Sequence, residues 1–287
     1  IATAILFTWS LFRGLRLKYS LQQHLRFFLL GVLLFSFNYI ATYSAQQYIS
    51  SALNAVAFSA MMWMNVINSR IFLGTRIEPR LWLGAILGLV GIITLFWPEI
   101  SVISLSDKVF LGAGLSLTGA FLASLGNIAS KTSQGEGLPI LQSNAWGMLY
   151  GTIITGLVAW YRDIPFNFEM SLSYVSTLLY LAIFGTVIAF GAYLKLVGRI
   201  GPHKAGYVVV MFPVVAVLMS MAFEGLDLTL NMFIGIVLVL AGNTMILGFW
   251  KKGPELRSWL EEQKHYWFDR KQVVNTACKH PSSWIPE

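Results

Sequence analysis

The sequence predicts an all-α, polytopic membrane protein. Hydrophobic residues make up 56% of the 287 residues and charged residues only 11%, whereas a typical soluble domain carries roughly 25% charged residues. The apolar residues gather in runs of about twenty, the length that a helix needs to cross a bilayer core of about 30 Å. A transmembrane β-barrel would instead show short segments of alternating hydropathy. The composition excludes a disordered chain, a collagen and a coiled coil, and it argues against a soluble enzyme.

Nine apolar segments follow one another along the chain, joined by short polar connections. The first is too short to cross a membrane, so we interpret it as the end of a truncated helix. No basic region or small-residue cleavage site marks a signal peptide at the start. The segments are residues 1–12, 24–46, 51–73, 81–98, 109–131, 139–161, 173–197, 204–224 and 229–250.

The basic residues predict how these segments cross the membrane. Arg13 and Arg16 follow the first segment, residues 46–51 have no Lys or Arg, and this alternation continues to the C-terminal tail. Lys and Arg concentrate on the cytoplasmic side of membrane helices, so we expect a cytoplasmic C-terminus, with residues 99–108 and 163–171 outside. The net charge of +7 therefore indicates a membrane rather than nucleic acid as the partner.

An internal repeat is visible at an offset of 151 residues. Residues 51–97 can be laid on residues 202–248 without gaps, and three glycines then fall in register. The offset spans five segments, an odd number, so the two copies cross the membrane in opposite directions. Inverted repeats of this kind are a common plan of secondary transporters. The glycine pairs are Gly74 with Gly225, Gly84 with Gly235, and Gly91 with Gly242.

The repeat also predicts the domain organisation. Two copies of five helices would make ten, so we expect helix one and the start of helix two to be missing from this sequence. The predicted parts are a truncated first repeat at residues 1–98, a second repeat at 109–250, and a cytoplasmic tail at 251–287. Apolar residues of the tail fall near one helix face, which suits an amphipathic helix at the membrane surface. An extension without such a helix fits the tail equally well.

Four stretches of the sequence resemble the EamA family of the drug/metabolite transporter superfamily. They are residues 211–229 (MFPVVAVLMSMAFEGLDLT), 235–243 (GIVLVLAGN), 51–77 (SALNAVAFSAMMWMNVINSRIFLGTRI) and 141–151 (LQSNAWGMLYG). The resemblance covers roughly residues 1–250 and implies two inverted five-helix repeats and the export or exchange of small metabolites. Two positions depart from the family, which often has a proline where this chain has Met62 and a glutamate where it has Thr75.

The sequence predicts no catalytic, cofactor or metal site. Its one cysteine, Cys278, excludes a disulfide framework and a thiolate metal site. The four histidines do not stand at a two-ligand helical spacing, and no carboxylate pair lies within an apolar segment. We therefore expect a protein that binds a small molecule and is not an enzyme.

A polar stripe in the segment 51–73 is the best sign of a binding site. Its members repeat at intervals of three and four residues, which places them on one helix face. Amides are costly against lipid, so this face should turn inward. It would then form either a wall of a substrate cavity or a set of hydrogen bonds between helices. The stripe comprises Asn54, Phe58, Met61, Asn65 and Asn68, and the repeat-related positions are the apolar Ala205, Val209, Phe212, Ala216 and Met219.

Other polar and aromatic side chains are further candidates for the site. For Tyr207 the alternative is a place at the membrane interface, and for Trp63 it is core packing. Pro213 lies in mid-segment, where a proline kinks a helix, so it is either a gating hinge or a static kink. Glu224 would couple protons to transport, or else cap the next helix or face water. The remaining candidates are Asn38, Tyr39, Tyr43, Ser124, Asn127 and Tyr193.

These features together predict a secondary transporter in a bacterial inner membrane, which exports or exchanges amino-acid-like or drug-like metabolites by alternating access. One alternative is a sugar-phosphate or nucleotide-sugar antiporter of the same superfamily, which would need several Lys or Arg side chains inside its cavity. Another is a membrane sensor or scaffold that transports nothing. The expected partners are a small-molecule substrate and the lipid bilayer, and the sequence does not predict an oligomeric state.

Overall fold

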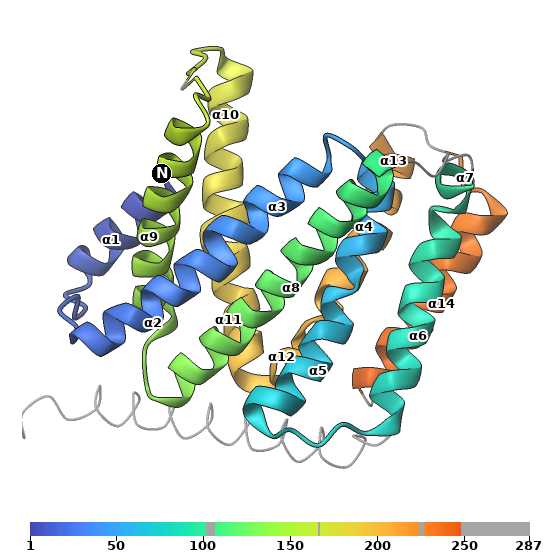
Figure 1. The fold of residues 1–287 in the computed structure, drawn as a ribbon, viewed down its shortest axis with the longest axis horizontal. Coiled ribbons are helices and arrows are strands. Elements are labelled where there is room, and N and C mark those ends of the chain that lie inside the picture. Colours follow the sequence, from blue (N-terminus) through green and yellow to red (C-terminus); the bar gives the residue numbers. More distant parts are fainter. Residues whose placement is uncertain (102–106, 166, 224–226, 248–287) are drawn as a thin grey trace, which may run out of the picture. The chain divides into compact units, whose positions relative to one another are not determined.

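The computed structural model describes residues 1–101, 107–165, 167–223 and 227–247, which fold into helices joined by short connections (Figure 1). Every apolar segment predicted from the sequence contains a helix, so the all-helical prediction is confirmed. Within the described residues, five helical stretches are long and apolar enough to cross a membrane. They are Leu21–Ala45, Leu53–Leu73, Asp107–Gly135, Leu172–Ile200 and Pro202–Met219.

Most of these stretches contain a bend or a change of helix type, so they comprise several elements. The part before residue 102 contains α1 (Ala2–Phe12), α2 (Leu21–Val32), the π-helical η1 (Leu33–Phe37), α3 (Asn38–Ala45), α4 (Ser51–Ser59), α5 (Met61–Leu73), α6 (Pro79–Leu95) and α7 (Trp97–Ile100). The part after residue 106 contains α8 (Asp107–Gly135), α9 (Ile140–Tyr161), α10 (Leu172–Tyr180), the π-helical η2 (Leu181–Ile188), α11 (Ala189–Ile200), α12 (Pro202–Ala205), α13 (Tyr207–Phe223) and α14 (Leu230–Leu247).

Local sequence signals set where the helices begin and end. The Ser20 hydroxyl accepts a hydrogen bond from the Gln23 N–H, and the Gln23 side chain accepts one from the Ser20 N–H, so a capping box starts α2. Ser50 caps α4 by accepting from the Leu53 N–H. Gly74 ends α5 with a φ of 63°, a left-handed conformation that glycine adopts without steric cost.

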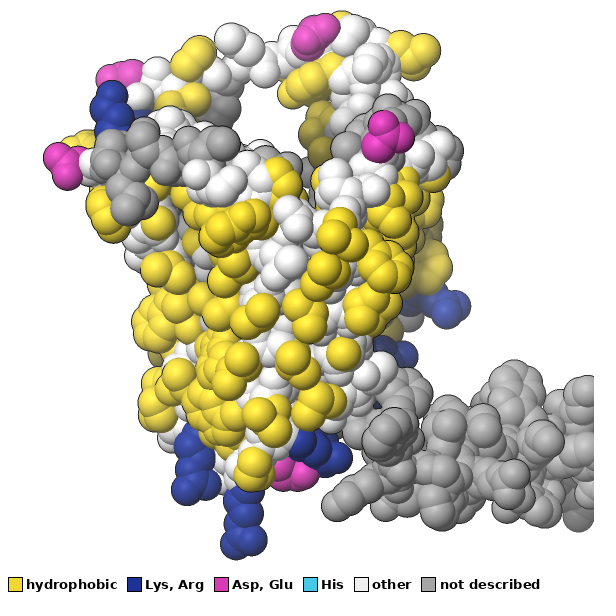
Figure 2. All heavy atoms as spheres, turned by 90° about the vertical axis from the view of Figure 1, so that its right-hand side faces the viewer, with side chains coloured by type: hydrophobic (Ala, Val, Ile, Leu, Met, Phe, Trp, Pro, Cys, Tyr) yellow, Lys and Arg dark blue, Asp and Glu magenta, His cyan; other side chains and the backbone are white. Residues whose placement is uncertain are grey.

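Successive long helices run in opposite directions, so their connections alternate between two ends of the helical unit (Figure 1). We call one the basic end, where residues 13–20, 74–78 and 136–139 lie, and the other the acidic end, where residues 46–50 and 162–171 lie. Figure 2 shows Lys and Arg mostly at the lower, basic end and Asp and Glu mostly at the upper, acidic end. Such a separation suits the predicted membrane topology. Which end faces the cytoplasm stays a prediction.

Helices α6 and α14 approach so closely that their backbones are in contact. A Cβ atom at Gly91 would lie 2.9 Å from the Gly235 carbonyl oxygen, and a Cβ at Gly242 would lie 2.6 Å from the Gly84 carbonyl oxygen. Only glycine fits at such distances. The contact is reciprocal, because Gly84 faces Gly242 while its repeat counterpart Gly235 faces Gly91. Close packing therefore explains two of the three glycine pairs found in register.

Among the described residues, three groups of buried apolar side chains hold the helices together, the smallest of which joins Leu6 of α1 to Met148 of α9. One lies among α5, α6, α13 and α14 and includes Met62, Leu81 and Val210. Another lies among α2, η1, α8 and α11 and includes Leu30 and Leu194. Several members of this second group also line the cavity described next, so the same packing that stabilises the fold shapes its wall.

Candidate functional site

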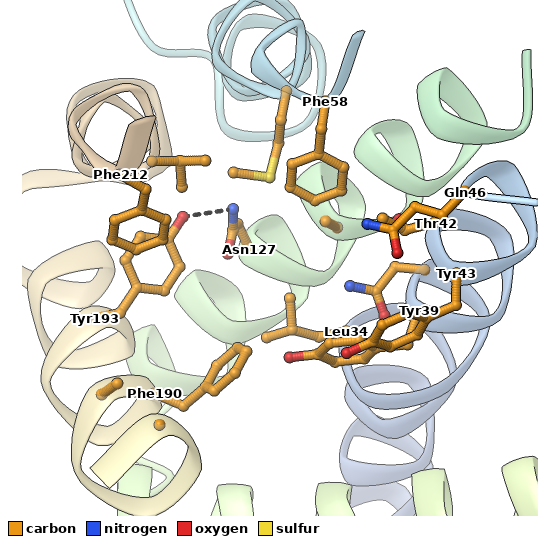
Figure 3. A pocket seen from close by; sticks show the side chains of 16 residues that line it. Leu34, Tyr39, Thr42, Tyr43, Gln46, Phe58, Asn127, Phe190, Tyr193 and Phe212 are labelled. Carbon is orange, nitrogen blue, oxygen red and sulfur yellow. Dashed lines mark hydrogen bonds between the residues drawn. The ribbon is translucent and has the colours of Figure 1, made fainter. Parts of the chain in front are cut away.

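A cavity of about 430 Å³ lies among α3, α4, α8, α11 and α13 (Figure 3). On the α3 side the lining runs from Asn38, the first residue of that helix, to Gln46, just past its end. The cavity therefore reaches the acidic end. In the middle of the unit it is bounded by Asn127 of α8.

The cavity wall is aromatic and uncharged. Tyr39 and Tyr43 are stacked on one side, with ring centroids 6.0 Å apart and an interplanar angle of 19°. Phe190, Tyr193 and Phe212 form the opposite side (Figure 3). None of the described residues that line the cavity is an Asp, Glu, Lys, Arg or His. Such a wall suits an apolar molecule that carries a few polar groups.

A buried amide network closes the cavity on the side of the basic end. The Asn127 Nδ2 donates to the Tyr193 hydroxyl over 2.9 Å and to the Asn65 Oδ1 over 3.3 Å. The Asn68 Nδ2 donates to the Ser124 Oγ over 2.9 Å. Because Asn65 and Asn68 belong to α5, these bonds tie α5, α8 and α11 together directly beneath the cavity.

Further hydrogen bonds join α8 to α11 closer to the basic end. The Gln134 Nε2 donates to the Leu194 carbonyl oxygen over 2.9 Å, and the Lys131 Nζ donates to the Gly198 carbonyl oxygen over 2.5 Å. We call these four residues the basic-end latch. An ion pair between Arg26 and Glu136 lies at the same end. The unit is thus hollow toward the acidic end and bonded shut toward the basic end.

The structure places seven of the predicted candidates in the cavity wall. Asn65 lies behind this wall, bonded to Asn127, and Ser124 is bonded to Asn68. Part of the predicted stripe of segment 51–73, Phe58 and Met61, therefore lines the cavity, and another part, Asn65 and Asn68, forms hydrogen bonds between helices. The seven are Asn38, Tyr39, Tyr43, Phe58, Met61, Asn127 and Tyr193.

Other candidates lie outside the cavity wall. The Asn54 carbonyl oxygen accepts from Ser116 of α8. Trp63 packs on Trp82 with ring centroids 5.0 Å apart, and Tyr207 is buried and donates to the carbonyl oxygen of Leu81 over 2.9 Å. The side chains of Trp63 and Tyr207 thus occupy helix–helix contacts, and Asn54 is buried. Pro213 lies within α13, next to the cavity residue Phe212, and Glu224 falls outside the described residues.

Sequence reasoning missed most of the apolar wall, because it searched mainly for polar side chains, and it also missed the polar Thr42 and Gln46. In the sequence, Phe212 and Val209 stand out only as apolar counterparts of the polar stripe. The repeat offset was the signal that could have found them, since each lies 151 residues after a predicted lining residue. The lining residues not predicted are Leu34, Thr42, Gln46, Ala123, Gly185, Ala189, Phe190, Val209 and Phe212.

The sequence profile of one family covers most of the chain, matching residues 1–97 and 110–248. The chain belongs to the EamA-like transporter family. This EamA-like chain is 29% identical over 226 residues to the uncharacterized inner membrane transporter YedA of Escherichia coli (strain K12), over 78% of this chain and 71% of YedA. It is 23% identical over 230 residues to the uncharacterized transporter YoaV of Bacillus subtilis (strain 168), over 79% of this chain and 77% of YoaV.

A protein of known crystal structure shares the fold of the EamA-like chain. It superposes with a TM-score of 0.72 at 18% sequence identity, over 85% of this chain and 82% of the other. Its place in the EamA-like transporter family makes this chain a multi-pass membrane protein and a transporter rather than an enzyme, and implies a small-molecule substrate and the membrane as partners.

Proposed function

We propose that the cavity is the substrate site of a secondary transporter that exports or exchanges small metabolites across an inner membrane by alternating access. The internal symmetry of the cavity wall carries this proposal. Six pairs of lining residues are related by the repeat offset of 151. The pairs are Leu34 with Gly185, Asn38 with Ala189, Tyr39 with Phe190, Thr42 with Tyr193, Phe58 with Val209, and Met61 with Phe212.

This pairing supports two inverted repeats that meet at the cavity. The related helices α3 and α11 end at opposite ends of the unit (Figure 1), as an inverted repeat requires. The π-helical segments are also related, because η1 shifted by 151 residues falls within η2. Substrate sites of secondary transporters commonly lie at the interface between repeats, near the middle of the membrane.

The latch and the amide network support alternating access. They close the cavity toward the basic end, whereas the cavity opens toward the acidic end. Such one-sided access is expected of each of the two states of an alternating-access transporter. In the predicted orientation the basic end is cytoplasmic, and this state would face outward. An uncharged wall also makes the sugar-phosphate alternative less suitable, since a phosphate is normally held by Lys or Arg.

Filling the cavity tests the transport function. Ala189 lines the cavity and its side chain is exposed there, so Ala189→Trp should fit without disturbing the packed core. We expect the rate at which proteoliposomes exchange metabolites from a labelled cell extract to fall at least tenfold. The thermal stability of the variant should stay normal.

Ala4→Trp is the matched control, because Ala4 is exposed on α1 away from the cavity. It should transport normally. Equal transport by the two variants would contradict a substrate site in this cavity, and the absence of transport by the unmodified protein would favour the sensor or scaffold.

Cysteine labelling tests the orientation. Gln22 lies at the basic end and Asn167 at the acidic end, and both are exposed. In a Cys278→Ser background, Asn167→Cys should react with an impermeant thiol reagent in intact cells, whereas Gln22→Cys should react only after permeabilisation. The opposite result would reverse the predicted topology.

A further inference from the structure

The cavity has an electron-rich wall and lacks charged side chains. Six of the described lining residues are aromatic, and the face of an aromatic ring carries negative electrostatic potential. A bound cation gains from such faces, as in the aromatic cages that recognise ammonium groups. A bound anion would lose its hydration without meeting a positive charge, which is costly.

Two amide oxygens in the wall add to its attraction for cations. The Oδ1 atoms of Asn38 and Asn127 have no hydrogen-bond partner among the described residues. In the structure Asn127 is oriented so that its Nδ2 donates to both Tyr193 and Asn65. Its oxygen is therefore an unpaired acceptor, which an N–H donor of a ligand can satisfy.

The acidic end, toward which the cavity opens, carries a net negative charge that suits a cationic ligand. Acidic side chains there outnumber basic ones among the described residues, which favours the approach of cations. A volume of about 430 Å³ lies within the usual range for small-molecule sites, roughly 300–1,000 Å³. The charged residues at this end are Asp107, Asp163, Glu169 and Asp227, with Lys108 and Arg162.

We propose that the cavity selects an organic monocation, a protonated amine that carries an apolar ring, over neutral and anionic molecules of the same shape. The apolar ring lies between the stacked Tyr39–Tyr43 pair and Phe190, and the ammonium group meets ring faces and the oxygen of Asn127. This inference rests on the proposed transport function, because it assigns a substrate class to the same cavity.

Three probes of similar shape and different charge test the selection. They are 2-phenylethylammonium, 2-phenylethanol and 3-phenylpropanoate, whose binding to the full-length protein in lipid nanodiscs is measured by calorimetry at neutral pH, with empty nanodiscs as the blank. We expect the cation to bind at least about tenfold more tightly than the alcohol. We expect no saturable binding of the anion. Equal or tighter binding of the alcohol or the anion would overturn the proposal.

A pair of substitutions at one position tests the role of the ring. Tyr39→Phe keeps the ring face, so the affinity for 2-phenylethylammonium should change less than threefold, whereas Tyr39→Leu should lower it about tenfold. The affinity for 2-phenylethanol should fall much less in Tyr39→Leu. A matched control is Tyr180→Leu, at an exposed position on α10 outside the cavity, which should bind all probes normally. An equal loss for the cation and the alcohol in Tyr39→Leu would overturn the proposal.

The exchange of cell-extract metabolites distinguishes a failure of the charge selection from a failure of the proposed transport function. If proteoliposomes exchange metabolites from a cell extract, but 2-phenylethylammonium neither binds nor competes, the charge selection is wrong and the transport function stands. If the extract is not exchanged and none of the probes binds, the proposed function and the charge selection fail together. Competition by 2-phenylethylammonium but not by 3-phenylpropanoate would support both.

Discussion

Replacing Gly91 with valine is expected to destroy the packing of α6 on α14 and to leave little folded protein. A Cβ atom there would lie 2.8 Å from the Val239 backbone nitrogen and 2.9 Å from the Gly235 carbonyl oxygen. Overpacking typically costs about 1–3 kcal/mol where side chains can give way. Backbone atoms inside helices cannot give way, so the free energy of unfolding should fall by more than this. Size-exclusion chromatography and thermal unfolding in detergent measure the result.

Gly114→Val is the matched control for this substitution. Gly114 lies in the helix α8, and a Cβ atom added there meets no other atom within 4 Å. The control should therefore give a yield and a melting temperature close to those of the unmodified protein. Similar yields of the two variants would mean that α6 and α14 do not approach each other as closely as described.

Breaking the basic-end latch is expected to shift the protein toward a state that opens at the basic end. Lys131→Met and Gln134→Met together remove the donors to the Gly198 and Leu194 carbonyl oxygens while nearly keeping side-chain volume. A neutral hydrogen bond contributes about 0.5–1.5 kcal/mol and one from a charged donor about 1.5–3 kcal/mol. If the latch forms in only one state, the ratio of the two states should change by roughly thirtyfold to two-thousandfold.

The thiol reactivity of a buried position reports this shift. Val197 is fully buried in α11 between the latch residues, so Val197→Cys should react slowly in a Cys278→Ser background and much faster when the latch is broken. Lys195→Met changes an exposed lysine on the same helix and should leave the rate unchanged. Unchanged reactivity in the Lys131→Met, Gln134→Met variant would mean that these bonds do not hold the basic end closed.

Periodicity predicted most of the fold because the signals for a helix are local. The capping serine Ser20, the terminal glycine Gly74 and the apolar runs can all be seen in short windows of sequence. Local signals do not predict the change of helix type at η1 and η2, because a π-helical turn depends on the packing around it. The close contact of α6 with α14 could be anticipated only because the glycines recur in register.

The sequence predicted most of the polar lining residues but only two of the apolar ones, Phe58 and Met61, and the reason is physical. A buried asparagine must find a partner, but the sequence does not say whether that partner is a ligand or another helix. Asn127 lines the cavity, whereas Asn65 is bonded behind it and Asn68 pairs with Ser124. Apolar lining residues such as Phe212 look like any lipid-facing or core residue, so only the repeat relation distinguishes them.

The π-helical segments make the site depend on rotational phase as well as on side-chain identity. A π-helical turn holds about one residue more than an α-helical turn, and one residue corresponds to a rotation of about 100° in an α-helix. Because η1 precedes α3, it sets the direction in which Asn38 and Tyr39 point, and η2 does the same for Phe190. If the same number of residues in η1 formed α-helical turns instead, these α3 side chains would be rotated by about 100° relative to the cavity, although none of them would be replaced. The cavity wall is thus encoded partly in the number of residues within two helices.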